Sequence, residues 1–200
     1  MRAKHAAAIA CLAVAACVHE RADLDLRADA RPVGHWRVLE PTRVRAELDL
    51  PGVGARERRT RDGELVQDLV LANDTRVAGE NRLTLAVDYG PPDGRVRADG
   101  PRLGRYGFTP AELEAELARA LPGARIAPGP VLRSNGYGPY YAVTAEYPGE
   151  AACVFAWQVI DGGAHLPPGA RRASLVLRWC TRAANADGPL RAFDRLRLAV

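Results

Sequence analysis

Residues 152–161 read ACVFAWQVID, and residues 173–182 read ASLVLRWCTR. Both segments are short, largely apolar and rich in β-branched and aromatic residues, which is typical of strands. Residues 162–169, between them, contain three glycines and two prolines, a composition that favours a turn over a continuous element. The two segments therefore predict a β-hairpin, and the rest of the fold is built outward from it.

One cysteine in each segment sets the expected register of this hairpin. If Cys153 faces Cys180 across antiparallel strands, the centre of the hairpin falls between Leu166 and Pro167, inside the Gly- and Pro-rich segment. Two further facing pairs follow from that register: Phe155 with Arg178, and Trp157 with Val176. An arginine beside an aromatic ring contributes about 0.5–1 kcal/mol when the pair is exposed.

Three more strands are expected upstream. Residues 140–147 are separated from residues 152–161 by Pro148-Gly149-Glu150, which predicts a second hairpin. Residues 81–89 alternate between apolar and polar side chains, as a half-buried strand does, and residues 64–73 are apolar enough for another strand.

One helix is marked at both ends. Thr109 is a predicted N-cap, Pro110 occupies the first helical position, and Glu112 completes a capping box. Pro122-Gly123 ends the helix. Leucines at a spacing of four form its apolar stripe: Leu113, Leu117 and Leu121. Because so short a helix needs tertiary support, we expect this stripe to pack on the sheet. The fold class is therefore α+β, a single small domain over residues 51–200, mostly antiparallel sheet with one main helix packed on it.

The N-terminus has the organisation of an exported lipoprotein. Arg2 and Lys4 precede the apolar residues 6–16, a run too short to span a bilayer, and Val14-Ala15-Ala16-Cys17 closes it. This predicts a lipoprotein signal peptide at residues 1–16 and acyl chains on Cys17, with an ordinary cleaved signal as the alternative. Residues 17–50 are charged and interrupted by proline, which predicts a flexible tether.

Composition and charge exclude several classes of protein. The formal net charge of +4 includes Arg2 and Lys4 of the signal, and arginines alternate with acidic residues along the chain. No basic cluster of the kind that binds nucleic acid is present in the sequence, so nucleic acid is not an expected partner. Lys4 is the only lysine, so a mature chain has no P-loop lysine and no Schiff-base lysine.

The remaining cysteines indicate a disulfide bond. Of the four cysteines, Cys11 leaves with the signal and Cys17 is assigned to lipid. Cys153 and Cys180 then form an even pair in an oxidising compartment, where a disulfide is the default. The histidines His19, His35 and His165 show no metal-ligand spacing with them, so neither zinc nor another cofactor is expected.

No catalytic group stands out. Ser134, His165 and Asp161 can be combined into a Ser-His-Asp set, but no nucleophile elbow or oxyanion-hole glycine pattern accompanies them. Glu146, Glu150 and Asp161 are the candidate carboxylates for glycoside cleavage, but solvated surface charge is the better explanation of them. We therefore expect a protein that is not an enzyme.

The segment Ser134-Asn135-Gly136-Tyr137-Gly138-Pro139-Tyr140-Tyr141 is the most distinctive of the chain. Flat aromatic faces with a few polar groups suit a sugar-binding surface, and Trp157 is expected on the neighbouring strand. The alternative is a tight turn followed by a strand whose tyrosines pack in the core. The residues assigned to this candidate glycan or partner surface are Asn135, Tyr137, Tyr140, Trp157 and Gln158.

Five stretches of the sequence, in this order, resemble the bacterial cellulose biosynthesis protein BcsN family: Gly79-Glu80-Asn81, Ala120-Leu121-Pro122-Gly123, Asn135-Gly136-Tyr137-Gly138-Pro139-Tyr140, Cys153-Val154-Phe155-Ala156-Trp157-Gln158 and Leu177-Arg178-Trp179-Cys180. The likeness covers residues 58–180. Tyr141 departs from it, because the family tends to have a glycine there.

This resemblance implies an envelope lipoprotein that is made with cellulose synthase components and acts as an accessory to them. It offers no catalytic residues. Val18 follows the cysteine where retention in the inner membrane usually shows aspartate, which favours the outer membrane, facing the periplasm. The expected partners are components of the cellulose synthase complex and, through the anchor, the membrane. The alternative function is a periplasmic glucan-binding module that uses Tyr137, Tyr140 and Trp157.

Overall fold

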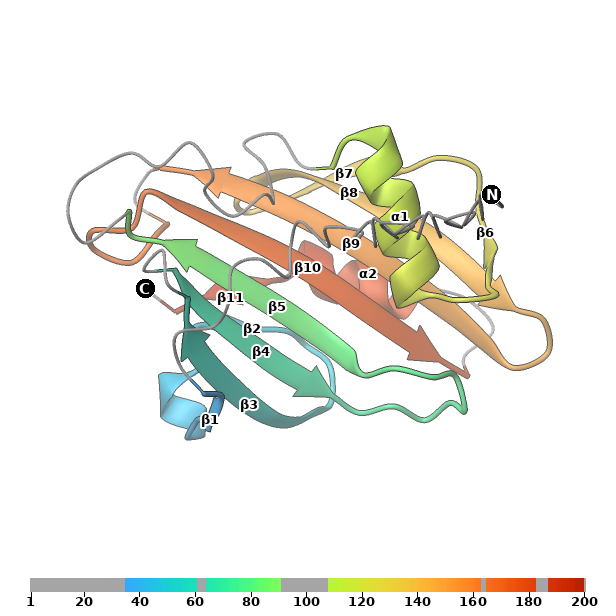
Figure 1. The fold of residues 1–200 in the computed structure, drawn as a ribbon, viewed down its shortest axis with the longest axis horizontal. Helices are drawn as coiled ribbons and strands as arrows, with labels where there is room; N and C mark the ends of the chain where they lie inside the picture. The colour runs from blue at the N-terminus through green and yellow to red at the C-terminus, as the bar shows by residue number, and fades with distance from the viewer. Residues whose placement is uncertain (1–34, 61–63, 91–107, 163–164, 183–186, 200) are drawn as a thin grey trace, which may run out of the picture.

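The computed structural model describes residues 35–60, 64–90, 108–162, 165–182 and 187–199. Its main element is a nine-stranded antiparallel sheet (Figure 1). Along the sheet the strands are β1 (Arg37–Val38), β3 (Gly52–Arg59), β4 (Leu65–Leu71), β5 (Asn81–Asp88), β10 (Arg172–Thr181), β9 (Ala151–Asp161), β8 (Gly138–Tyr147) and β6 (Arg125–Ile126). A further strand, β7 (Val131–Asn135), also pairs with β8.

The hairpin predicted from the two quoted segments is confirmed. Strand β9 pairs with β10 in the expected register, with Cys153 opposite Cys180, and a disulfide bond joins the two. Phe155 lies opposite Arg178, as predicted. The guanidinium of Arg178 donates to the backbone carbonyls of Glu80, before β5, and of Ala120, so its polar contacts are with other segments of the chain.

Helix α1 (Pro110–Ala120) is confirmed together with its N-terminal signals. Thr109 is the N-cap, and both hydrogen bonds of the capping box with Glu112 are present. The leucine stripe packs on one face of the sheet, where Leu117 and Leu121 are buried against the β9 side chains of Phe155 and other residues. Alternate residues of β9 point to opposite faces, so this face also contains the disulfide.

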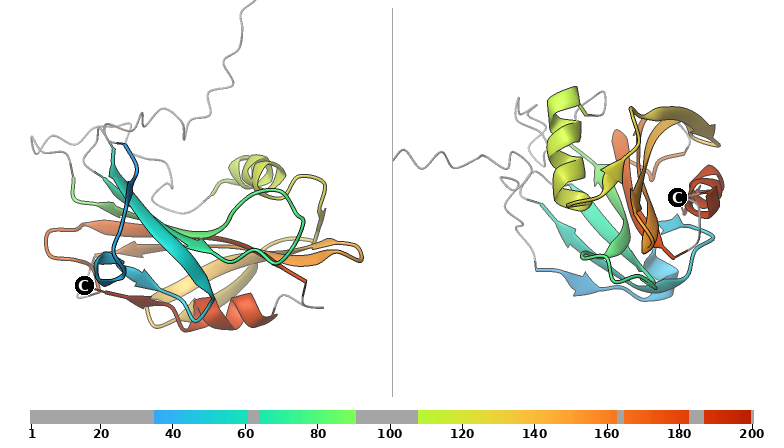
Figure 2. Two further views of the ribbon diagram at one scale, coloured as in Figure 1. Left: turned by 90° about the horizontal axis from the view of Figure 1, so that it is seen from below. Right: turned by 90° about the vertical axis from the view of Figure 1, so that its right-hand side faces the viewer.

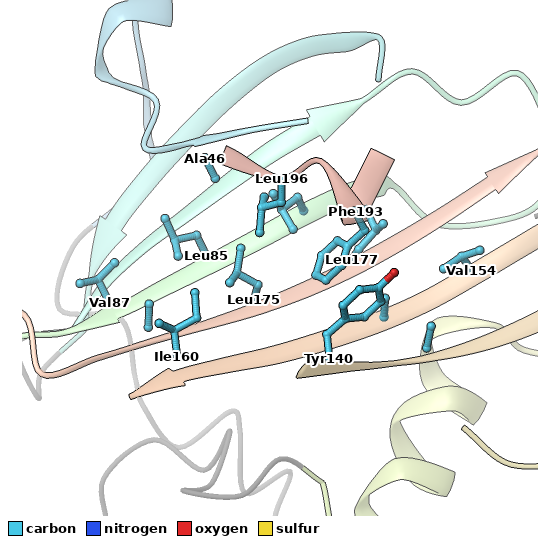
Figure 3. Packing of buried hydrophobic residues seen from close by; sticks show 14 of the residues in the cluster. Ala46, Leu85, Val87, Tyr140, Val154, Ile160, Leu175, Leu177, Phe193 and Leu196 are labelled. Carbon is cyan, nitrogen blue, oxygen red and sulfur yellow. The ribbon is translucent and has the colours of Figure 1, made fainter. Parts of the chain in front are cut away.

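The prediction of one main helix is only partly right, because a second helix, α2 (Asp187–Asp194), covers the opposite face of the sheet (Figure 2). Pro189, Ala192 and Phe193 are its buried residues. Phe193 packs in a larger core with Leu175 and Leu177 of β10 (Figure 3). Helix α2 was not predicted from the sequence because the helix is only two turns long. Its first turn also contains Gly188 and Pro189, and both residue types are poor helix formers in general.

The folded domain begins earlier than the predicted boundary at residue 51. Strand β1 pairs with β3, and a 3-10 turn (Pro41–Arg43) leads to β2 (Ala46–Glu47). Strand β2 pairs with β11 (Arg197–Leu198) in a separate two-stranded sheet. Leu39 and Ala46 are buried, so residues 35–50 belong to the fold and not to a tether.

The predicted signal peptide and Cys17 lie outside the described residues. In the part of the chain that the structure describes, no helix has both the length and the apolar character needed to cross a membrane.

Candidate functional site

The five residues assigned to a candidate glycan or partner surface lie on both faces of the sheet. Tyr140 points toward α2 and belongs to the core on that side (Figure 3). Trp157 belongs to the core on the α1 side, with Phe108 in edge contact with its ring at 5.2 Å. A single surface cannot therefore contain both aromatic rings.

Asn135 and Gln158 form a reciprocal amide pair between β7 and β9. Each side-chain nitrogen donates to the side-chain oxygen of the other residue at 2.9 Å. Gln158 also donates to the carbonyl of Gly138, and Asn135 donates to the carbonyl of Phe193 in α2. Because Gln158 is 1% exposed, this pair satisfies polar groups inside the fold and attaches α2 to the sheet.

A second set of contacts holds the end of α2. The Tyr140 hydroxyl donates to the Asp194 carboxylate at 2.6 Å, and Arg133 donates to both the Tyr140 hydroxyl and the Asp194 carboxylate. Burial opposes ionisation of Asp194, but the hydrogen bonds from Arg133 and Tyr140 outweigh it and lower its pKa. Burial, followed by the hydrogen bond to Asp194, raises the pKa of Tyr140. The three side chains therefore form an ion pair bridged by a neutral phenol.

Tyr137 binds the strand that follows α2. Its hydroxyl accepts a hydrogen bond of 2.7 Å from the backbone N–H of Leu198 in β11, and its ring meets His165 edge-on at 5.4 Å. The backbone N–H of Tyr137 donates to the Asn135 side chain, which closes the turn between β7 and β8. Together with Asn135, Tyr140 and Gln158, Tyr137 thus joins the C-terminal segment to the sheet; we call these four residues the C-terminal clamp.

The interpretation of Tyr140, Trp157 and Gln158 as a sugar-binding surface is wrong. Tyr140 is 0% exposed and Trp157 is 4% exposed, because α2 covers the first and α1 with its preceding Phe108 covers the second. Tyr141 is the neighbouring aromatic residue that reaches the surface: it is 42% exposed and stacks on Trp157 at 5.6 Å. The alternative that these tyrosines pack in the core applies to Tyr140.

A second polar centre, around Arg178, was not identified as a site from the sequence. Arg178 is 6% exposed, and its guanidinium donates to the carbonyls of Ala78, Gly79, Glu80 and Ala120. Burial lowers the pKa of this guanidinium. Since Ala120 is the last residue of α1, Arg178 connects α1 and the loop before β5 to the middle of the sheet.

Asn81 completes this centre. Its side chain exchanges hydrogen bonds of 2.8 Å with the backbone of Cys180, and it also donates to the carbonyl of Ala72 and accepts from Arg178. Asn81 is 0% exposed. The signal that could have revealed this centre is the combination of Gly79-Glu80-Asn81 with Leu177-Arg178-Trp179-Cys180, two of the stretches that carry the family resemblance.

The candidate catalytic groups are not brought together by any hydrogen bond between described residues. Ser134 is exposed on β7, and His165 contacts Tyr137. Asp161 accepts from Arg172, and Glu146 accepts from Arg125. Within the described ranges, no three His, Cys, Asp or Glu side chains gather in a way that could hold a metal ion.

The five stretches that carry the resemblance thus meet in two places, the C-terminal clamp and the Arg178 centre. The family model for cellulose biosynthesis protein BcsN matches residues 50–200. No curated protein and no solved structure matches the chain. The matched range is most of the sequence and includes both places. The chain therefore belongs to the cellulose biosynthesis protein BcsN family.

Proposed function

We propose that this protein is a lipid-anchored accessory protein of bacterial cellulose biosynthesis or export, without catalytic activity of its own. The family match over residues 50–200 is the observation that carries the proposal. The partners proposed on this basis are components of the cellulose synthase complex. The location proposed is the periplasmic side of the outer membrane, with residues 1–16 as a signal peptide and Cys17 as the acylated residue.

The use of the polar side chains supports a role without catalysis. Asn135, Tyr140 and Gln158 direct their polar atoms at other groups of the same domain, and Arg178 does the same. Side chains engaged in this way fix the positions of two helices and leave few donors for a substrate. An accessory protein needs a rigid surface, and side chains that fix the helices in this way provide one.

A deletion strain tests the cellulose role. Removing the gene is expected to lower the cellulose on the cell surface while the level of the synthase stays unchanged, and the wild-type gene should restore it. A Ser134→Ala gene should restore it equally, because Ser134 is not proposed to act as a nucleophile. Unchanged cellulose in the deletion strain contradicts the proposal.

Replacing Cys17 tests the anchor separately. Intact mass of the native protein should show an N-terminal cysteine with acyl chains, and Cys17→Ala should move the protein from the membrane fraction to the soluble fraction. An unmodified N-terminus in the native protein contradicts the proposed anchor, but it leaves the family assignment unaffected.

A further inference from the structure

A patch of exposed apolar and basic side chains lies at the β1 edge of the sheet, where the described part of the chain begins. Trp36 is 38% exposed and Val38 is 87% exposed. Val38 lies opposite Arg56 in the pairing of β1 with β3. The guanidinium groups of Arg56 and Arg58 lie over the Trp36 ring at 5.0 Å and 4.6 Å. We call Trp36, Val38, Arg56 and Arg58 the Trp36 patch.

The two arginines of the patch differ in how their charge is compensated. Arg56 is paired with Asp68 and Glu80, at 3.1 Å and 2.7 Å. Arg58 has no ion pair or side-chain hydrogen bond with any residue in the described ranges, and its Nε atom is buried without an acceptor. Leaving a guanidinium donor unpaired is unfavourable. The buried Nε atom cannot be reached from outside, but the two Nη groups are not buried, so these groups of Arg58 keep donors for an acceptor from outside the domain.

The composition of the patch fits the headgroup region of a membrane. An indole ring sits well at the boundary between apolar and hydrated layers, and a neighbouring valine adds apolar contact. A planar guanidinium binds phosphate oxygens with paired N–H groups and is attracted by an anionic leaflet. A purely apolar docking partner would leave the charge of Arg58 uncompensated.

The position of the patch supports the same occupant. Residues 18–34 connect it to Cys17, the proposed site of the lipid anchor, and a chain of that length spans at most about 60 Å when fully extended. An anchor at that distance keeps the patch close to the membrane and so raises its effective concentration at the membrane surface. Even a weak contact between the patch and the lipid headgroups is then formed for much of the time. We infer that the Trp36 patch docks the domain on the anionic phospholipid surface of the leaflet that holds the anchor.

This inference rests on the proposed anchor and not on the role in cellulose biosynthesis. Its first test uses the full chain with Cys17→Ser, which cannot be acylated, in flotation with vesicles of phosphatidylethanolamine and phosphatidylglycerol. The chain should float with these vesicles, less so at high salt, and much less with vesicles of phosphatidylethanolamine and phosphatidylcholine. Arg58→Gln should weaken binding about fivefold, the loss expected for one basic residue near an anionic surface. Trp36→Ala should weaken it at least as much.

Leu132→Ala is the matched control. Leu132 is 60% exposed on β7, at the other end of the sheet, so its replacement should leave flotation unchanged. The inference is overturned if the folded Cys17→Ser chain does not float with phosphatidylglycerol vesicles, or if Trp36→Ala floats like its parent. It is also overturned if sedimentation shows a dimer that depends on Trp36 and that does not bind vesicles.

The acylated protein gives a second test. In vesicles that contain brominated phospholipids, tryptophan fluorescence should be quenched, and Trp36→Phe should remove most of the quenching. Trp179→Phe should not, because Trp179 donates to Ala72 inside the fold. Quenching that persists in Trp36→Phe contradicts the inference. If intact mass shows no acyl chain on Cys17, the anchor is wrong, and flotation of the Cys17→Ser chain still decides whether the patch binds lipid.

Discussion

The Tyr140 hydroxyl donates a hydrogen bond of 2.6 Å to the Asp194 carboxylate, and this contact joins residues on β8 and α2 that are 54 positions apart in the sequence. Arg133 of β7 binds both groups. These contacts hold the end of α2 against the core that contains the Tyr140 ring. The Tyr140 ring meets the Phe193 ring edge-on, with 4.8 Å between the ring centres. The stability of the C-terminal segment should therefore depend on the charge of one carboxylate.

We expect stability to fall at acid pH through Asp194. Its pKa is lower in the folded protein than in the unfolded chain, so its contribution is complete above the unfolded pKa and is lost as pH falls through the folded value. The loss should begin at roughly pH 4 and continue below it. Asp194→Asn should flatten this part of the profile and cost about 1.5–3 kcal/mol at neutral pH.

Urea unfolding at several pH values measures this effect. Ser134→Ala, at an exposed position of β7 next to Arg133, is the control and should keep the pH dependence of the wild type, because it removes no titratable group. A profile for Asp194→Asn that still falls as steeply as that of the wild type would show that the ion pair does not stabilise the fold.

The disulfide should contribute substantially to stability. Cys153 and Cys180 are separated by 27 positions, and closing a loop of that length contributes about 3.5 kcal/mol in the chain-entropy model. The double variant Cys153→Ala with Cys180→Ala should lose about this amount in urea unfolding. Reduction of the unfolded wild-type protein should give the same loss on refolding without oxidant. Two free thiols in the native protein would contradict the predicted bridge.

Gly79 should tolerate substitution poorly for two reasons. Its φ is +97°, where other residues are strained, and an added Cβ would approach the Arg178 guanidinium to 3.1 Å. Gly123 has a similar φ of +77° but open space around the added carbon. Gly123→Ala should therefore cost about 1 kcal/mol, and Gly79→Ala should cost more, because it also displaces Arg178. Equal losses in thermal unfolding would show that the contact with Arg178 is unimportant.

Arg178→Lys should be strongly destabilising although it keeps the charge. A lysine cannot reproduce the planar set of donors that binds the carbonyls of Ala78, Glu80 and Ala120, and unpaired buried carbonyls cost about 1–3 kcal/mol. We expect a loss of about 2–4 kcal/mol, together with faster hydrogen exchange in α1. Arg82→Lys on β5, whose side chain is 35% exposed, should cost under 1 kcal/mol. A small effect of Arg178→Lys would contradict the role of the Arg178 centre.

Local patterns predicted the elements whose signals lie close together in the chain. The capping box of α1 depends on Thr109, Pro110 and Glu112, which are neighbours, and the structure reproduces it. Strand β5 follows from its alternation, and the register of β9 with β10 follows from two cysteines. In each case one local feature is enough to predict the element: the period of the strand, the cap of the helix or the pair of cysteines.

The elements that the sequence did not reveal depend on distant partners. Strand β3 is rich in charged side chains, and Glu57 pairs with Arg37 of β1. Strand β7 shows no alternation and becomes a strand by pairing with β8. Helix α2 is stabilised by the core around Phe193 more than by its own residues.

The sequence by itself determined the central hairpin with its disulfide and the capped helix. Strand period and cap chemistry act between neighbouring residues, and the two cysteines are joined by one covalent bond. The family also follows from the sequence, through the five stretches that resemble it. Only the tertiary structure decided what the distinctive polar and aromatic residues do. Tyr140 and Gln158 were candidates for an exposed surface, and burial beneath α2 makes them part of its attachment. Which face of a strand becomes covered depends on elements far away in the chain, and a side chain's role follows from that burial.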